Sequence, residues 1–127
     1  MDKQKFKLEY SLKSSPKVLF NRLSTPSGLS EWFADNVNVE SNNNIYIFIW
    51  NDHHQKAEVI SKKDLSFIRF QWEEEDDDSY FEFRIIVEDL TGDLALIITD
   101  FAEEDEVEDA IQLWDTQIDK LKKIIGS

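Results

Sequence analysis

The sequence predicts a single α+β domain in which an antiparallel sheet of about seven strands packs against one long C-terminal helix. Seven segments have the residue pattern of β-strands, and the last 25 residues carry an apolar side chain at every third or fourth position. The strands from residue 37 onward are joined by short connections, which require antiparallel pairing because parallel neighbours need a crossover of about a dozen residues. A helix with one apolar face must bury that face against the sheet.

The composition narrows the class of protein. The chain has 127 residues, of which 41% are hydrophobic and 13% aromatic, enough for the core of one domain spanning residues 1–127. Its net charge of −13 would repel phosphate groups and anionic lipids, so we expect neither nucleic-acid binding nor direct membrane insertion, whereas a basic protein partner fits this charge. The lack of cysteine excludes disulfides and thiol chemistry. No segment resembles a signal peptide or reaches the roughly 18 apolar residues of a membrane span, and we therefore expect a cytoplasmic protein.

The first third of the chain predicts one strand and two short helices. Residues 6–13 alternate apolar and polar side chains, as a strand with one buried face does. Ser15 and Pro16 then have the residue types of a helix N-cap and first helical position. Residues 25–28 (TPSG) are expected to break this helix, and residues 29–33 (LSEWF) to form the second one.

The remaining strands follow one another from residue 37 to residue 101. The six segments with strand patterns are 37–40, 45–50, 55–61, 65–72, 80–88 and 94–101. The turns that join these six segments are expected at 41–44, 51–54, 62–64, 73–78 and 89–93. Strand 45–50 is apolar on both faces, so its outer face must meet another element or a partner, of which a second copy of the chain is the simplest.

The closing segment, residues 103–127, predicts an amphipathic helix. The apolar positions that fall on one helical face are Val107, Ile111, Trp114, Ile118, Leu121 and Ile125. The opposite face is charged, as the solvent side of a helix on a sheet should be.

The order of these elements resembles that of a known group of proteins. The residues that carry the resemblance are Ser14–Phe20 after the first strand, then Leu29–Phe33, and the closing helix with Trp114, Leu121 and Ile125. The chain is similar over almost its whole length to the helix-grip, or SRPBCC, superfamily, which includes birch-pollen-allergen-like proteins, START lipid-transfer domains and Aha-type activators of a heat-shock ATPase. The resemblance implies a curved sheet wrapped on the last helix, often with an apolar cavity between them, but no single chemistry.

One departure points to a branch of this superfamily. Allergen-like members have a glycine-rich loop between early strands, whereas the turn at residues 41–44 contains no glycine. The chain therefore resembles most the small bacterial START-like proteins of the Aha type.

Apolar side chains on the inner sheet face and on the last helix could line a cavity for a small molecule. The contacts that we predict for such a ligand are Trp32, Phe70, Trp72, Phe83, Ile98, Trp114 and Ile118. The same side chains could instead fill the interior completely, because protein cores pack at a density of about 0.75. Both interpretations are open from the sequence.

The histidines and the acidic runs do not predict a metal site. His53 and His54 fall in an expected turn, where adjacent side chains rarely reach one ion. The acidic run 73–78 lacks the glycine and the ligand spacing of a calcium loop, and the run 103–109 suits the positive end of a helix dipole. We expect no metal and no cofactor.

The charged side chains within the strands could point either outward or into the cavity. Arg69 and Arg84 lie beside Glu82 and Glu88, which predicts ion pairs on the convex face. The alternative is an inward arginine that binds a carboxylate ligand.

The sequence contains no catalytic triad order, phosphate loop or metalloprotease motif. The other polar groups expected near the cavity are Tyr46, Ser66 and Tyr80, and none is paired with a recognisable base. We therefore favour a protein that is not an enzyme.

Two functional hypotheses rank ahead of a third, an enzyme of cyclase or hydrolase type. The leading one is non-catalytic binding of a small hydrophobic or amphipathic ligand between the sheet and the C-terminal helix. The alternative is a protein-interaction module with a filled core, co-chaperone-like or homodimerising, which uses its acidic surface or the outer face of strand 45–50.

Overall fold

The computed structural model describes residues 3–40, 42, 44–74 and 78–127. The elements in chain order are β1 (Lys3–Leu12), α1 (Pro16–Ser24), α2 (Pro26–Leu29), β2 (Asn36–Glu40), β3 (Ile45–Trp50), β4 (His53–Lys63), β5 (Phe67–Trp72), β6 (Phe81–Val87), β7 (Leu94–Glu103), the 3₁₀ turn η1 (Glu104–Glu106) and α3 (Val107–Ile125). The predicted α+β class and element order are confirmed.

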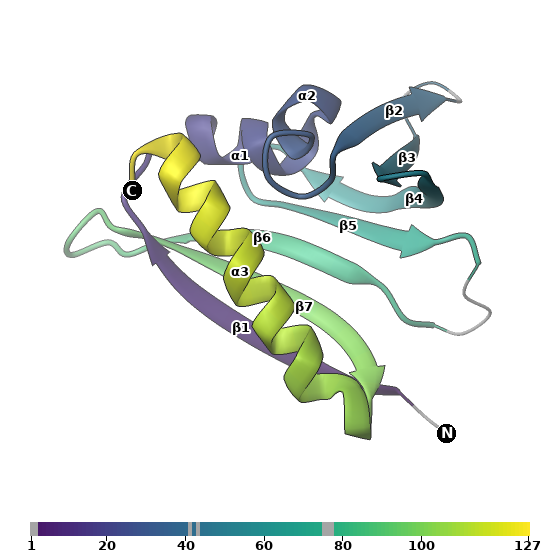
Figure 1. Cartoon of the computed structure of the whole chain (residues 1–127). Coiled ribbons are helices and arrows are strands. Elements are labelled where there is room, and N and C mark those ends of the chain that lie inside the picture. The colour runs from purple at the N-terminus through teal and green to yellow at the C-terminus, as the bar shows by residue number, and fades with distance from the viewer. Residues whose placement is uncertain (1–2, 41, 43, 75–77) are drawn as a thin grey trace.

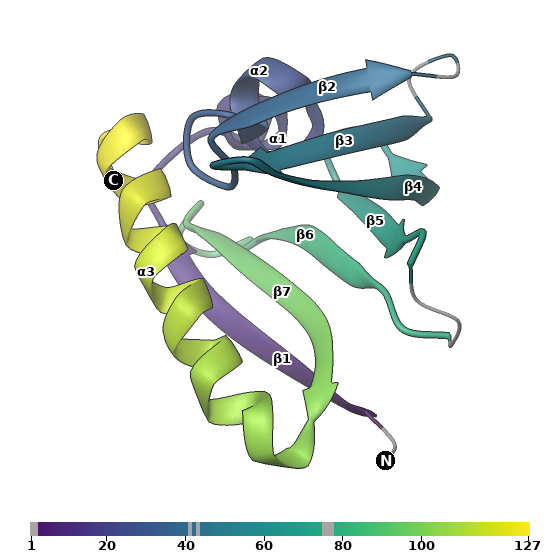
Figure 2. The same cartoon turned by 45° about the vertical axis from the view of Figure 1, so that its right-hand side comes forward.

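The strands form one antiparallel sheet of seven, in the order β1-β7-β6-β5-β4-β3-β2. The first and last strands pair along their whole length, from Lys3 opposite Glu103 to Leu12 opposite Leu94. The sheet is strongly curved, and α3 lies across its concave side over β1 and β7 (Figure 1). Turning the molecule places α3 on one side of the concavity and the β2–β4 half of the sheet on the other (Figure 2). This arrangement leaves the inner faces of β3 and β5 opposite a flank of the helix.

The two short helices are joined through one threonine. Ser15 caps α1 by accepting a hydrogen bond from the backbone N of Val18 at 3.1 Å. Thr25 ends α1 and also caps α2, because its Oγ1 accepts from the backbone N of Gly28 at 2.9 Å. Residues 25–28 therefore end the first helix, as predicted, and also begin the second, whose predicted position at residues 29–33 is wrong.

The hairpin turns differ from expectation in length. Only Asn51 and Asp52 form the turn after β3, so His53 and His54 belong to β4 and not to a turn. Strand β4 continues to Lys63 with an irregularity between Val59 and Ser61. The expected turns at 41–44 and 73–78 lie partly outside the described residues, at positions 41, 43 and 75–77.

Aromatic side chains fill most of the space between sheet and helix. Strand alternation turns Phe48, Phe70, Phe81 and Phe83 to the concave face, where each is at most 1% exposed. The rings of Phe70 and Phe81 stack at a centroid distance of 4.9 Å. Open space between sheet and helix therefore lies at the margin of this core.

The helix α3 is not buried evenly along its length. Trp114, Ile118 and Leu121 are buried, whereas Val107 and Ile111, nearer its start, are only half-buried. The predicted apolar face does meet the sheet, but it packs more loosely in the first half of the helix. No helix in the described part of the chain is long and apolar enough to cross a membrane.

Candidate ligand-binding groove

A groove with a volume of about 390 Å³ opens between the first half of α3 and the inner faces of β3 and β5. Its aromatic walls are Phe33, Trp50, Trp72 and Trp114, and its other lining residues are Asp100, Ala110, Leu113 and Gln117. The volume lies in the range of small-molecule sites, which are mostly apolar with a few polar groups.

Two of the aromatic walls come from matching positions in the sheet. Trp50 is the last residue of β3 and Trp72 the last residue of β5, and these two strands run in the same direction on either side of β4. Each tryptophan extends an inward-facing row of its strand, so both lie at the same end of the concave face. Their ring centroids are 6.2 Å apart.

Phe33 is the third aromatic residue of the groove, and it contacts both α3 and β3. Its ring stacks on Trp114 at a centroid distance of 5.7 Å and an interplanar angle of 16°. Its carbonyl oxygen accepts hydrogen bonds from Trp50 Nε1 at 2.9 Å and from Gln117 Nε2 at 3.1 Å. One backbone carbonyl therefore fixes side chains from both sides of the groove.

Asp100 brings a carboxylate into this aromatic surface. It follows Leu96 and Ile98 on the inward-facing row of β7. Its Oδ2 accepts a hydrogen bond from Trp114 Nε1 at 2.9 Å, and its Oδ1 accepts one from the backbone N of Phe101 at 2.8 Å. Both bonds help to orient the carboxylate in the groove wall.

A second, more open hollow continues along the same flank of α3. It has a volume of about 600 Å³ and shares Ala110 and Leu113 with the groove. Its other lining residues are Lys3, Phe101, Ala102, Glu103, Glu106 and Asp109. The aromatic groove thus opens toward an acidic rim.

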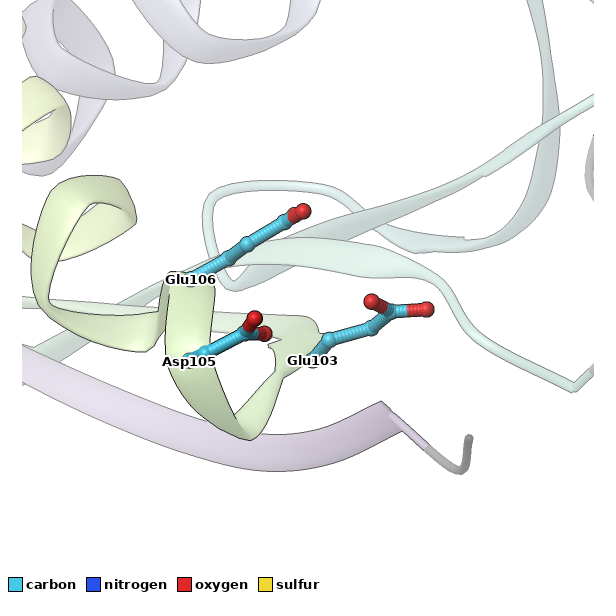
Figure 3. Close-up of side chains that lie close together, drawn as sticks. All are labelled: Glu103, Asp105 and Glu106. Atoms are coloured by element: carbon cyan, nitrogen blue, oxygen red, sulfur yellow. The ribbon is translucent and has the colours of Figure 1, made fainter.

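Three carboxylates gather at this rim. Oxygens of Glu103, Asp105 and Glu106 lie within 4.8 Å of one another, on the turn that joins β7 to α3 (Figure 3). Such a set could hold a divalent cation, but Asp105 and Glu106 are exposed and the start of α3 already favours negative charge there. We assign no metal to it.

The structure separates the seven predicted contact residues into two groups. Trp72 and Trp114 line the groove. The other five lie in the core behind it, namely Trp32, Phe70, Phe83, Ile98 and Ile118, each at most 2% exposed. Trp32 packs against Phe33 and Phe83 and donates its indole N–H to the carbonyl of Arg22 at 2.8 Å.

Six groove residues were not among the seven predicted contacts: Phe33, Trp50, Asp100, Ala110, Leu113 and Gln117. Asp100 could have been found, because it continues the period-two row of inward residues in its strand. Leu113 and Gln117 lie beside the apolar face of α3, and nothing in their spacing identifies them.

The arginines lie on the convex face, as predicted, and do not enter the groove. Arg69 Nη2 lies 2.8 Å from Glu82 Oε1, and Arg84 Nε lies 3.1 Å from Glu82 Oε2. Burial by itself would raise the pKa of Glu82, but the hydrogen bonds from both arginines hold this pKa below its usual range. The ion pairs are therefore part of the outer sheet surface.

The other polar candidates also lie outside the groove. Tyr46 is buried and donates its hydroxyl to the carbonyl of Ser24 at 2.6 Å, and burial raises its pKa above the usual value. Tyr80 packs against Phe101 and lies under the guanidinium of Arg69. His53 and His54 are exposed neighbours in β4, where successive side chains point to opposite faces.

These features define a class of protein first. A curved antiparallel sheet around a C-terminal helix, with two short helices after the first strand, is the helix-grip arrangement of α+β proteins. A family model described as a START-like superfamily domain matches residues 1–127, and the chain belongs to that superfamily.

Solved structures of similar proteins support this assignment. The protein BfR322 from Bacteroides fragilis is 40% identical, with 98% of this chain and 92% of that chain covered and a TM-score of 0.69. The Aha1 dimer from Colwellia psychrerythraea is 16% identical, with 96% of each chain covered and a TM-score of 0.78. An uncharacterised Bacillus thuringiensis protein is 6% identical, with 98% and 100% covered and a TM-score of 0.82. A comparison with curated proteins gave no match.

Proposed function

We propose that this protein binds a small apolar or amphipathic molecule, without chemical conversion, in the groove between α3 and strands β3 and β5. The observation that carries the proposal is the aromatic lining contributed by Phe33, Trp50, Trp72 and Trp114 around a space of about 390 Å³. Large aromatic surfaces that remain accessible in a groove are typical of small-molecule sites. The START-like superfamily, whose members commonly bind ligands, supports the same function.

The test is binding of the neutral apolar dye N-phenyl-1-naphthylamine, followed by its fluorescence. We expect a saturable rise in fluorescence with the wild-type protein. Ala110 lies in the groove wall, so Ala110→Trp should fill part of the space and weaken dye binding about tenfold or more. The matched control is Gln112→Trp, which places the same side chain on the exposed face of the same helix.

The two variants separate groove binding from other effects. Gln112→Trp should bind the dye as the wild type does, and circular dichroism should give the same helix content for all three proteins. Equal dye affinity in Ala110→Trp and wild type, or no saturable binding at all, would contradict the proposal.

We infer self-association through the outer face of β3 as a second candidate function. Ile45, Ile47 and Ile49 point outward and keep part of their side chains exposed, and the similar Colwellia protein is described as a dimer. Ile47 lies between Asn38 and Lys56 on the neighbouring strands, so a glutamate there would place a charge at the centre of the contact.

Sedimentation velocity tests this second candidate. We expect a dimer of the wild type at micromolar concentrations and a monomer of Ile47→Glu, because a buried unpaired charge opposes association. The control is Gln112→Glu, which adds the same charge on the exposed face of α3, away from β3. A wild type that stays monomeric at all concentrations would rule out self-association.

A further inference from the structure

We propose that the ligand of this groove carries a neutral sugar, which binds at the mouth of the groove against Trp72. This inference rests on the proposed function, which places the apolar part of the ligand in the groove, and it adds the chemistry of the polar part. Two half-buried rings carry it, together with the polar side chains that the strand register places beside them.

Trp50 and Trp72 are the accessible rings of the groove wall. Phe33 and Trp114 are only 5% and 6% exposed and stack on each other, whereas Trp50 and Trp72 are half-buried. The centroids of these two indoles are 6.2 Å apart and their planes are inclined by 56°, so they form an aromatic corner. The C–H face of a sugar ring is flat and apolar, and it can pack against such a ring through dispersion and edge-to-face contacts.

Polar side chains continue the concave face beyond these rings. In the pairing of β3 with β4, Gln55 lies opposite the buried Phe48 and His53 lies opposite Trp50. Cross-strand partners share a face of the sheet, so both side chains lie on the concave side. Nε2 of Gln55 lies 3.2 Å from Nε2 of His53. Because an amide nitrogen can only donate, this contact leaves the amide oxygen of Gln55 as an acceptor for a ligand.

A small hollow adjoins Trp72 on this polar side. It has a volume of about 90 Å³ and is lined by Gln55, Lys56, Trp72 and Glu74. This volume is about that of three water molecules, enough for the hydroxyl groups at one edge of a sugar ring. Trp72 lines both the hollow and the aromatic groove, so one ring separates an apolar space from a polar one. A ligand that lies across this ring has an apolar part at one end and a hydroxylated part at the other.

The indole N–H of Trp72 adds a hydrogen-bond donor. The other three tryptophans donate their indole N–H groups to oxygen atoms of the protein. The N–H of Trp72 donates to no residue in the described part of the chain. A donor on Trp72 and acceptors on Gln55 and Glu74 match hydroxyl groups, which both donate and accept.

The charges around the small hollow favour a neutral group. Nζ of Lys56 lies 3.0 Å from Oε1 of Glu40, so this lysine already has a carboxylate partner. An anionic group would therefore meet the carboxylate of Glu74 without an available lysine among the lining residues, all of which are described. A cationic group would gain little, because Glu74 is exposed and exposed ion pairs contribute little. A neutral sugar uses the same carboxylate and amide as hydrogen-bond partners.

The experiment compares an amphipathic glycoside with its two parts. The probes are hexyl β-D-glucoside below its micelle concentration, 1-hexanol, and methyl β-D-glucoside. Binding is followed by NMR through the four indole N–H signals of the ¹⁵N-labelled protein. We expect hexyl glucoside to shift the Trp50 and Trp72 signals saturably, and to bind at least about tenfold more tightly than either part alone.

A variant pair assigns the sugar contact to one side chain. Gln55→Met keeps the length of the side chain but removes its amide, so it should lower the affinity for hexyl glucoside about tenfold and leave 1-hexanol unchanged. Gln112→Met makes the same change on the exposed face of α3 and should alter neither affinity. Circular dichroism should give the same spectrum for both variants and the wild type.

The outcomes distinguish this inference from the function on which it rests. Equal affinity for hexyl glucoside and 1-hexanol, or unchanged glucoside binding in Gln55→Met, would overturn the sugar site. If the apolar dye then still binds in a manner that depends on Ala110, the groove remains a site for apolar molecules without a sugar. Loss of dye binding in that assay would remove the proposed function itself.

Discussion

Glu82 is a buried carboxylate held between two arginines on the convex face. It is 4% exposed, while the side chains of Arg69 and Arg84 remain 33% and 37% exposed. The arginines pack in turn on aromatic rings, with Arg69 over Tyr80 and Arg84 over Phe67. The cluster joins β5 to β6 on the face opposite the groove.

Glu82→Gln should lower the free energy of unfolding by roughly 1–3 kcal/mol at pH 7, because it removes charge-assisted hydrogen bonds from a buried position. The pKa of Glu82 is lowered on folding, so this stability is present above the unfolded-state pKa of about 4.3 and is lost as pH falls through the folded-state pKa. Urea unfolding between pH 3 and pH 7 should therefore give curves for wild type and variant that converge in acid.

The control for this prediction is Glu88→Gln, at an exposed position just beyond the same strand. It should change stability little at any pH. A difference between wild type and Glu82→Gln that persists unchanged at pH 3 would contradict the electrostatic origin of the effect.

The burial of each residue determines whether a substitution there can test the groove. Ile118 was predicted as a ligand contact, yet its side chain is completely buried on the inner side of α3. A tryptophan there would overpack the core at a cost of about 1–3 kcal/mol, so lost binding could reflect disturbed folding. Ala110 lies at the groove surface and can be enlarged without entering the core.

At the scale of elements, α1 and α2 meet at a glycine. A Cβ at Gly28 would lie 2.7 Å from the Cα of Arg22 and against the carbonyl of Asn21, both backbone atoms that cannot rotate away. The close approach positions the segment after α2, from which Phe33 reaches the groove.

We expect Gly28→Ala to destabilise the protein by about 1–3 kcal/mol, because the added methyl group forces the two helices apart. It should also weaken binding of the apolar dye through displacement of Phe33. Thermal unfolding measures the first effect and dye titration the second. The matched control is Gly92→Ala, where no atom lies within 4 Å of the added Cβ and only the strain of a φ of +74° applies. Equal stability of Gly28→Ala and wild type would contradict this role of the glycine.

The position of α3 depends on contacts at its C-terminal end as well as on its apolar face. Gly126 adopts a left-handed conformation with φ of 75°, and its backbone N–H donates to the carbonyl of Lys122. The following Ser127 accepts a hydrogen bond from the backbone N of Lys13 at 2.8 Å. These contacts fix the end of α3 beside β1, while its first half remains less tightly packed.

At the scale of the whole molecule, the groove exists because α3 packs closely against one half of the sheet and less closely against the other. The strands on both sides of the concavity face the same aromatic core, but α3 lies over β1 and β7 (Figure 2). The groove remains between α3 and the last residues of β3 and β5, Trp50 and Trp72. The two predicted alternatives, a cavity and a filled core, are therefore both partly realised: the interior is packed, and open space remains at its margin.

The net charge of −13 acts on this whole arrangement. Like charges on one surface destabilise the compact state, and the structure offsets this only locally, as in the pairing of Glu82. The same charge attracts cationic molecules and basic surfaces. The hollow beside the groove carries three of the acidic residues, Glu103, Glu106 and Asp109.

The sequence by itself determined the order and type of the elements. Strand alternation and helical spacing are local patterns, and they correctly placed Phe70, Phe83 and Ile98 on the inner face and Trp114 on the buried side of the last helix. The Thr25-Pro26 pair was predicted correctly to end α1, but its second role as the start of α2 was missed, because one local pattern serves both as a helix end and as a helix start.

Only the tertiary structure decided which inner residues border the groove. Phe33, Trp50, Trp72, Asp100 and Trp114 come from five separate parts of the chain and meet because the curved sheet and α3 close unequally. The groove among them is the space left where the inner face of the sheet and the surface of α3 do not fit together completely. Its position depends on how closely the helix approaches each strand, a distance that no local pattern in the sequence specifies.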